Sequence, residues 1–376
     1  MFLKTFPFAI FVCLLFYSCN SNNRKQVEKK EDEVIALSYA KHFSIKQSKD
    51  FTVLELLGKD KQVTASFVLY KMQKPTYQKD VYYIKTPVKR VASMSSIYSA
   101  MLIKLGVQNS IVAIDNVDYY NNPFIINQVK KAAIIELSKG ATVDIEKTLQ
   151  LNPDLFLTFG MANPKSDIDK KLTQSHLPLA ISLDHLEQTP LARAEWIKFF
   201  SYFFDKEALA DSLFNSTEKN YNELKKAGQI AAKKPKVLTE IKYGDAWYVP
   251  SGDSYMAHLI EDAGGDYFWK DDIKTGSTPL SFEQVYLKAK DCDIWINLYN
   301  LNSKKELLSY DERYGLFKAY KTNHLFNNNK TQNALGYSNY WETGIVNPDE
   351  VLKDLIHVFN PALDVHYQFQ YYKKLE

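Results

Sequence analysis

Aromatic side chains stand in several polar segments of the sequence, and loop residues of this kind often carry function. The segments lie between predicted strands and helices, and they contain Tyr119, Tyr120, Trp247, Tyr248, Tyr299, Tyr337, Tyr340 and Trp341. A flat ring with one polar edge suits a large planar or amphipathic ligand. Trp247 and Trp341 are the strongest candidates, because a tryptophan in a polar loop is hard to explain as filler. Ordinary loop packing is the alternative, since 14% of the chain is aromatic.

The residue types that perform catalysis or hold a metal ion do not occur in the required patterns. None of the seven histidines has the short spacing to another that zinc sites use. The sequence has no glycine-rich phosphate loop, no Gly-x-Ser-x-Gly motif and no cysteine pair, and Cys292 lies in an apolar stretch typical of a core. We therefore predict a binding protein with no catalytic residue, no metal site and no cofactor. Met94 and His258 as axial ligands of a haem remain an alternative.

The first residues form a targeting segment rather than part of the fold. Lys4 precedes an apolar run from about residue 6 to 17, which is shorter than the roughly 20 residues of a membrane-spanning helix. The run ends at Ser18-Cys19, which resembles the bacterial lipobox, in which the cysteine is acylated and becomes the new N-terminus. We predict a lipoprotein signal peptide at 1–19, lipidation of Cys19 and a flexible tether at 20–33. An ordinary secretory signal with an incidental cysteine is the alternative.

The elements that must position the aromatic residues follow from the apolar patterns. Residues 34–87 contain short alternating apolar runs separated by turn signals, which predict a β-rich extension. Strands then alternate with helices in two stretches, 88–190 and 235–376. Such alternation indicates two lobes, each with a parallel sheet covered by helices.

The stretch between the lobes, 191–234, has helical spacing. One helix is predicted at 191–204 and a second from about 206 to 231, with Leu209, Leu213, Tyr221 and Leu224 on its apolar face. A helix of roughly 25 residues is about 37 Å long, enough to connect two lobes. The predicted fold is α/β, with two Rossmann-like lobes joined by a single long helix and a small β-rich N-terminal extension. The net charge of +3 without a basic stripe argues against nucleic acid as a partner.

Four segments in this order resemble the periplasmic-binding domain of receptors for iron siderophores and vitamin B12. They are residues 90–96 with 105–107, Asn152-Pro153-Asp154-Leu155, residues 254–265 and residues 348–361. The likeness covers roughly residues 88–361, and residues 34–85 fall outside it. The resemblance implies two α/β lobes joined by one rigid helix, with the ligand between them. It also implies a binder that hydrolyses nothing and whose partners are an ABC permease and its ATPase.

The resemblance also carries a docking site. In this family one glutamate of each lobe docks with arginines of the permease, and the matching positions are Glu146 and Glu283. A carboxylate near a helix N-terminus is compatible with the helix dipole, and on a rim it can form a charge-assisted pair with arginine. The alternative is that both glutamates only stabilise helix starts.

In open α/β sheets, ligands bind beyond the carboxyl ends of the strands. The loops expected there are 93–96, 115–122 and 160–163 in the first lobe, and 244–254, 297–302 and 336–341 in the second. The predicted ligand-binding residues are Ser95, Ser96, Asn116, Tyr119, Trp247, Tyr248, Tyr299, Tyr340 and Trp341. These loops contain little arginine, whereas catecholate and citrate complexes usually attract arginine clusters. A corrinoid or a hydroxamate chelate is therefore favoured.

We thus expect a monomeric solute-binding lipoprotein of an ABC importer, which captures a ferric siderophore or cobalamin and delivers it to a permease. It would be anchored in the bacterial cell envelope through its lipid and face the periplasm. The alternatives are a haem-binding lipoprotein, a surface lipoprotein that passes its ligand to an outer-membrane receptor, and an enzyme on a related fold.

Overall fold

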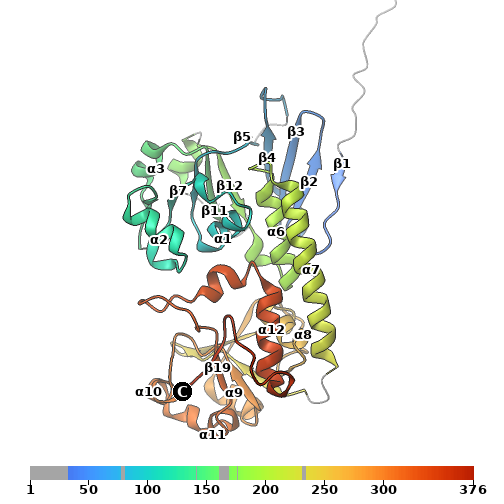
Figure 1. The fold of residues 1–376 in the computed structure, drawn as a ribbon, viewed down its shortest axis with the longest axis vertical. Helices are drawn as coiled ribbons and strands as arrows, with labels where there is room; N and C mark the ends of the chain where they lie inside the picture. Colours follow the sequence, from blue (N-terminus) through green and yellow to red (C-terminus); the bar gives the residue numbers. More distant parts are fainter. Residues whose placement is uncertain (1–32, 78–80, 141, 161–168, 176, 231–233) are drawn as a thin grey trace, which may run out of the picture. The chain divides into compact units, whose positions relative to one another are not determined.

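The computed structural model describes residues 33–77, 81–140, 142–160, 169–175, 177–230 and 234–376. The predicted signal peptide, its lipidation site Cys19 and nearly all of the predicted tether lie outside these residues, as do residues 161–163 of one predicted ligand loop. Along the chain, a β-sheet precedes a first α/β lobe, two consecutive helices and a second α/β lobe (Figure 1). The predicted fold class is thus confirmed. Among the described residues, no helix has the length and apolar character needed to cross a membrane.

The β-rich extension forms one sheet whose strands follow the order of the chain. The strands are β1 (Glu33–Ile35), β2 (Phe43–Gln47), β3 (Phe51–Leu57), β4 (Val63–Tyr70) and β5 (Tyr82–Lys85). The first four strands pair antiparallel, and β5 pairs parallel to β4. Phe43 packs against Trp196 and Phe199 of the helical region, with ring centroids 4.7 and 5.5 Å away. One face of this sheet is therefore buried against a helix.

The first lobe has a parallel sheet in the order β12-β11-β6-β7-β8. Its strands are β6 (Val91–Ser93), β7 (Ile111–Ile114), β8 (Ile135–Glu136), β11 (Leu155–Phe159) and β12 (Leu179–Ser182). Its helices are α1 (Ser96–Lys104), α2 (Pro123–Lys130), α3 (Ile145–Leu151) and α5 (Lys170–Gln174). A short hairpin, β9 (Ser138–Lys139) with β10 (Thr142–Val143), precedes α3.

The second lobe has a mixed sheet in the order β16-β13-β18-β19-β20, in which only β20 runs antiparallel. Its strands are β13 (Lys236–Thr239), β16 (Asp266–Tyr267), β18 (Ile294–Ile296), β19 (Leu325–Asn327) and β20 (Lys373–Lys374). A small antiparallel sheet adds β14 (Lys242–Tyr243), β15 (Ala246–Pro250) and β17 (Ser277–Leu280). The helices are α8 (Tyr255–Asp262), α9 (Phe282–Ala289), α10 (Lys304–Tyr310), α11 (Lys318–Lys321) and α12 (Pro348–Phe359).

Two helices connect the lobes, α6 (Pro190–Ser201) and the longer α7 (Glu207–Gln229). Thr189 caps α6 and Pro190 occupies its first turn, as the sequence predicts. The long helix contributes Phe214 to the core of the first lobe and Tyr221 to the core of the second. It therefore bridges both lobes, like the single rigid helix that the sequence predicts.

The apolar face of α7 agrees with the predicted one except at its start. Leu213, Tyr221 and Leu224 pack in or against the two cores, whereas Leu209 is exposed. The fully buried positions are Ala210, Phe214, Thr217, Tyr221 and Gly228. At the other end, Gly228 lies so close to the backbone after α8 that a Cβ atom there would come within 2.8 Å of the Asp262 carbonyl oxygen.

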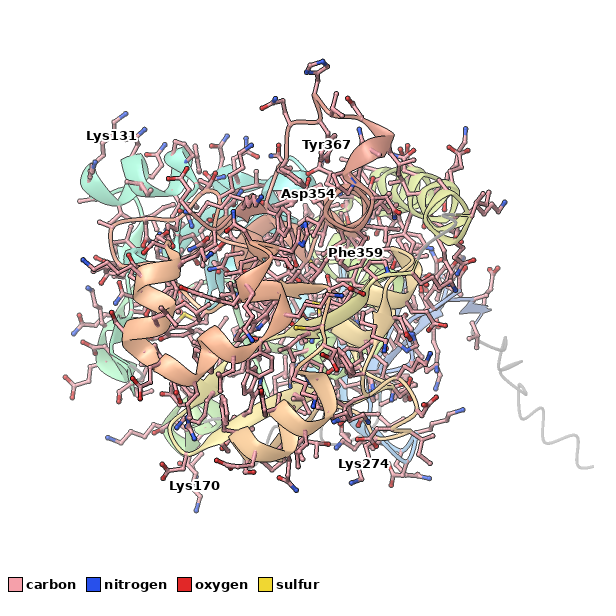
Figure 2. All side chains as sticks on the ribbon, turned by 90° about the horizontal axis from the view of Figure 1, so that it is seen from below. Lys131, Lys170, Lys274, Asp354, Phe359 and Tyr367 are labelled. Carbon is pink, nitrogen blue, oxygen red and sulfur yellow. The ribbon has the colours of Figure 1, made fainter. Side chains whose placement is uncertain are left out.

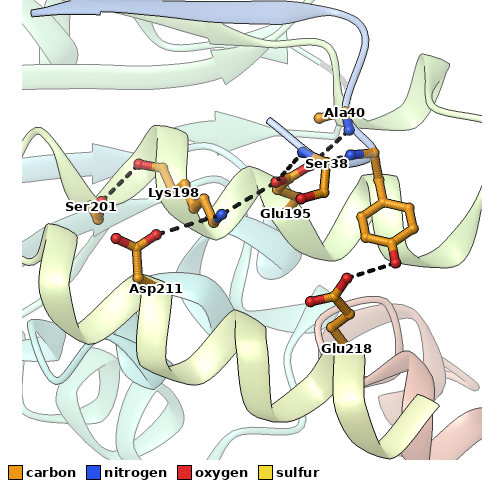
Figure 3. Close-up of polar contacts among 8 residues, drawn as sticks. Ser38, Ala40, Glu195, Lys198, Ser201, Asp211 and Glu218 are labelled. Carbon is orange, nitrogen blue, oxygen red and sulfur yellow. Dashed lines mark hydrogen bonds and ion pairs between the residues drawn. The ribbon is translucent and has the colours of Figure 1, made fainter. Parts of the chain in front are cut away.

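A buried glutamate on α6 ties the N-terminal extension to this helical region (Figure 3). The Glu195 carboxylate accepts hydrogen bonds from the backbone N–H groups of Ser38, Tyr39 and Ala40, at 2.9, 2.8 and 2.8 Å. Lys198 Nζ lies 3.3 Å from the same carboxylate and provides a balancing charge. The Tyr39 hydroxyl also donates to Glu218 on α7 at 2.7 Å. These contacts join the start of the extension to both connecting helices.

The C-terminal segment is held in the same way by Asp354 on α12. Its carboxylate accepts hydrogen bonds from the backbone N–H groups of Gln370, Tyr371 and Tyr372, and from the Tyr367 hydroxyl at 2.7 Å. Figure 2 marks Asp354 and Tyr367 on neighbouring elements of the second lobe. The anchored segment leads into β20, the edge strand of the second sheet.

We expect Glu195→Ala to lower the free energy of unfolding by about 3 kcal/mol, because three backbone amides lose their shared acceptor. Glu195→Gln keeps one acceptor oxygen and should cost roughly half as much. Glu218→Ala removes only the acceptor of the Tyr39 hydroxyl, so it is the matched control and should cost about 1 kcal/mol. Urea unfolding followed by circular dichroism measures all three. A loss for Glu195→Ala no larger than that of the control would contradict the anchoring role.

Candidate functional site

Two hollows lie where the parallel strands of each lobe end, and they share Trp341 in their walls. The first has a volume of about 240 Å³ and the second about 340 Å³. The first is lined by Met94, Ser95, Ser96, Asp115, Tyr119, Phe159, Tyr337, Ser338 and Trp341. The second is lined by Glu240, Ile241, Lys242, Tyr243, Tyr248, Pro250, Ser277, Tyr299, Tyr310 and Trp341. Their position is the one expected for a ligand site in open α/β sheets.

The wall shared by both hollows comes from a loop of the second lobe that contacts the first lobe. The Asn121 backbone N–H donates to Glu342 Oε2 at 2.7 Å, and the Asn333 side-chain amide donates to the Asp118 carbonyl oxygen at 2.6 Å. The rings of Tyr119 and Tyr337 meet edge to face at a centroid distance of 4.9 Å. We call residues 331–346 the crossing loop. It contains one turn of π-helix (Tyr340–Gly344), a local irregularity that is frequent at functional sites.

Six of the nine predicted ligand-binding residues line these hollows. They are Ser95, Ser96, Tyr119, Tyr248, Tyr299 and Trp341. Tyr248, Tyr299 and Trp341 are 47, 56 and 51% exposed, so their rings are accessible to a solute. The structure thus brings residues from five separate segments together, and their role in binding remains a prediction.

Trp247 does not line the cleft, contrary to the prediction. It is fully buried in the second lobe, where it stacks on Trp295 at 5.6 Å and donates its indole N–H to the Thr239 carbonyl oxygen. The physical reason is that this segment is the strand β15 rather than a loop. Successive side chains of a strand point to opposite faces, so Trp247 faces the core and Tyr248 faces the second hollow.

Tyr340 and Asn116 are also absent from the described walls. Tyr340 is 1% exposed and packs against the rings of Tyr371 and Tyr372, because the π-helical turn directs Trp341, rather than Tyr340, to the surface. Asn116 instead caps a short 3-10 turn, where its side chain accepts a hydrogen bond from the Asp118 backbone N–H at 2.9 Å. Tyr340 is therefore a buried packing residue, whereas Asn116 is partly exposed and caps a turn outside the walls of the two hollows.

Asp115 is a wall residue that the sequence analysis missed. It directly follows β7 and lines the first hollow. Burial raises the pKa of its carboxyl group to about 6. Its Oδ1 atom is buried without a hydrogen-bond partner among the described residues. The signal that was available is its place as the first polar residue after an apolar strand.

Glu240 holds the corresponding place in the second lobe. It follows β13 with a backbone φ of +63°, a left-handed conformation that is uncommon for a residue other than glycine. Burial raises the pKa of its carboxyl group to about 7. The Asn297 side-chain amide lies 3.4 Å from Glu240 Oε1, and Asn297 in turn accepts a hydrogen bond from the Tyr372 hydroxyl at 2.9 Å. Because the Tyr372 backbone N–H donates to Asp354, hydrogen bonds connect the C-terminal anchor to the cleft.

Glu146 and Glu283 both lie exposed in the first turn of a helix, α3 and α9 respectively. Asp144 caps α3, and a reciprocal capping pair of Ser281 and Gln284 begins α9. Other residues therefore already cap the N-termini of both helices. Backbone amide and Ser281 hydrogen bonds lower the pKa of Glu283, whose carboxylate also lies 3.2 Å from Arg313. Both glutamates are accessible to a partner.

Metal ligation finds no support among the described residues, which contain no group of three or more histidine, cysteine, aspartate or glutamate side chains that could hold an ion. Met94 lies in the wall of the first hollow, but His258 lines neither hollow and its Nε2 is 3.0 Å from Asp253 Oδ1. The structure therefore does not bring these two residues together as axial ligands. Cys292 is buried, which raises the pKa of its thiol to about 12, as expected for a core residue.

Comparison with known proteins gives both sequence and structural relatives. Residues 91–330 match the family model described as periplasmic binding protein. An uncharacterized lipoprotein of Methanocaldococcus jannaschii is 26% identical over 294 residues, which cover 74% of this chain and 66% of that protein, just under two thirds of its length.

Solved structures share the fold. A possible iron-binding (periplasmic solute-binding) protein from Staphylococcus epidermidis superposes with a TM-score of 0.56 at 19% identity, covering 73% of this chain and all of the other. The periplasmic vitamin B12 binding protein of Vibrio cholerae superposes with a TM-score of 0.51 at 14% identity, covering 74% of this chain and 99% of the other. The family model matches more than half of the chain, so this chain belongs to the periplasmic binding protein family.

Proposed function

We propose that this chain is the solute-binding component of an ABC importer, which captures a metal chelate in the cleft formed by the two hollows and delivers it to a permease. The chelate is a ferric siderophore or cobalamin. Support comes from the family, and from structural relatives described as iron-binding and as vitamin B12 binding. The lipobox-like Ser18-Cys19 and the lipoprotein relative support a lipid-anchored protein of the cell envelope, facing the periplasm.

The observation that carries this proposal is the arrangement of aromatic rings around the cleft. Trp341 stands in both walls, with Tyr119 in the first hollow and Tyr248 and Tyr299 in the second. Rings with a large flat face and one polar edge suit the apolar and amide surfaces of a corrinoid or a hydroxamate chelate. None of the described wall residues is an arginine, which weighs against a strongly anionic catecholate or citrate complex.

Two other functions remain candidates. A haem-binding lipoprotein is disfavoured because Met94 lines the first hollow, whereas His258 lines neither hollow and lies beside Asp253. A surface lipoprotein that hands its ligand to an outer-membrane receptor would use the same cleft but would not need Glu146 and Glu283. Uptake experiments on these two glutamates therefore distinguish the importer from the surface carrier.

We expect saturable binding, with one ligand per chain, when the protein from about Lys25 onward is titrated with cyanocobalamin, a ferric hydroxamate or a ferric catecholate. Trp196, Trp247, Trp269 and Trp295 are buried, so quenching of tryptophan fluorescence by the ligand should come mainly from the half-exposed Trp341. Trp341→Phe should remove most of the quenching and weaken binding roughly tenfold, as measured by calorimetry. Buried Trp269 provides the control variant, Trp269→Phe, which should keep both signals. A Trp341→Phe variant that still quenches and binds normally would contradict the cleft assignment.

We expect Glu146→Ala combined with Glu283→Ala to leave ligand affinity unchanged and to abolish uptake in cells. The reason is that each carboxylate would lose a charge-assisted pair with a permease arginine, weakening the docked complex by roughly thirtyfold or more. Glu223→Ala, an exposed residue of α7, is the matched control and should transport normally. Normal uptake by the double variant would remove the docking role and favour the surface carrier.

A further inference from the structure

The walls of the cleft carry more acidic than basic side chains. The charged wall residues are Asp115 in the first hollow, and Glu240 and Lys242 in the second. Lys242 Nζ lies 4.0 Å from the Asp311 carboxylate, so its positive charge already has a partner. Among the described residues, no lysine, arginine or histidine forms an ion pair with Asp115 or Glu240. The described walls therefore present two unbalanced carboxyl groups, one from each lobe.

The surroundings of Asp115 leave part of its carboxyl group unsatisfied. The Tyr120 hydroxyl and the Asn116 backbone N–H interact with it, and Tyr119 and Glu136 are the other titratable neighbours. Its Oδ1 atom nevertheless has no partner among the described residues. A buried acceptor without a donor is destabilising, and its presence usually has an explanation in function. A donor supplied by a bound ligand would provide that explanation.

Glu240 is held by only weak contacts from neutral donors. The Thr239 hydroxyl lies 3.5 Å and the Asn297 amide 3.4 Å from Glu240 Oε1, both at the long end of hydrogen bonding. Its titratable neighbours are Tyr267, Tyr340 and Tyr372, none of them cationic. The positive φ of this residue adds a strained backbone at the wall of the cleft, a feature that clusters at ligand sites.

We infer that the cleft takes a metal chelate whose outer surface carries cationic or N–H donor groups toward Asp115 and Glu240, with an apolar or planar part against Trp341. This inference rests on the proposed function and refines it. A donor or cationic group at each end would satisfy both carboxyl groups. An anionic chelate would instead place like charges together in a partly desolvated cleft, which is unfavourable. The cleft should therefore distinguish chelates of the same shape by their peripheral charge.

The pKa values give this inference a pH signature. Burial raises the pKa of Asp115 to about 6 and that of Glu240 to about 7, so both groups are neutral in acid and become ionised as pH rises through these values. The neighbouring tyrosines Tyr120, Tyr267, Tyr340 and Tyr372 have pKa values raised above their ordinary value by burial, so they stay neutral throughout. Affinity for a cationic chelate should accordingly rise from about pH 5 to about pH 8, and binding should release protons.

The test uses two series of chelates that differ only in peripheral charge, with the full chain purified in detergent. One series is the ferric complex of a linear trihydroxamate whose terminal amine is free, acetylated or succinylated. The other is a cobalamin with one side-chain amide converted to an amine-bearing group, left intact or hydrolysed to the acid. On the scaffold that binds, we expect roughly tenfold tighter binding of the cationic than of the neutral form, and a further tenfold loss for the anionic form.

The variants Asp115→Asn and Glu240→Gln should each weaken binding of the cationic form roughly tenfold and leave the neutral form within about twofold. Together they should abolish the pH dependence of affinity. Glu261→Gln, an exposed carboxylate on α8 outside both hollows, is the matched control and should change neither property.

Equal affinity for all three charge states, or tightest binding of the anionic form, would overturn the inference and leave chelate capture standing. A pH dependence that survives in the double variant would also overturn it. If neither the trihydroxamate series nor the cobalamin series binds in any charge state, the proposed function of chelate capture is contradicted, and this inference is contradicted with it.

Discussion

A buried carboxylate needs hydrogen-bond donors, and this chain meets that constraint twice with three consecutive backbone N–H groups. Glu195 accepts from Ser38, Tyr39 and Ala40, and Asp354 accepts from Gln370, Tyr371 and Tyr372. Each carboxylate is on a helix, and each fixes a segment near one end of the described chain. The N-terminal sheet is thereby attached to α6, and the C-terminal strand β20 is attached to the second sheet. The Asp354 contacts are connected to the cleft through hydrogen bonds of Tyr372 and Asn297, which lies beside Glu240. The Glu195 contacts fix the N-terminal sheet to the helices that connect the two lobes.

The connecting helices explain why two hollows form one site. α7 contributes to both cores, so neither lobe can be repacked without affecting the other. The close backbone approach at Gly228 fixes the end of α7 against the segment after α8. The short polar segments that follow the strands of each lobe line one hollow each, and Trp341 lines both hollows. Asp115 and Glu240 occupy equivalent positions after the strands β7 and β13, and the cleft combines one from each lobe.

Local sequence patterns predicted the elements well because they depend on local physics. Strand and helix periodicity, Pro190 at a helix start and capping residues such as Ser281 act within a few residues. The errors arose where a position depends on distant partners. The sequence predicts a loop at Trp247 because β15 pairs with a strand of only two residues, β14, and with β17 some thirty residues later. In the strand, Trp247 and Tyr248 point to opposite sides. The crossing loop could not be predicted, because its conformation depends on contacts with Asn121 and Asp118 more than 200 residues earlier.

The crossing loop has a consequence for motion. The loop belongs to the second lobe by sequence, yet its Asn333 donates a hydrogen bond to the first lobe and its Glu342 accepts one from it. Lys104 of α1, in the first lobe, also donates to Asn347, the residue that follows the loop. Within the part of the chain that the structure describes, the lobes are therefore joined both by the connecting helices and by this loop. Any movement that separates the two lobes has to break these polar contacts as well as displace the lobes about the helices.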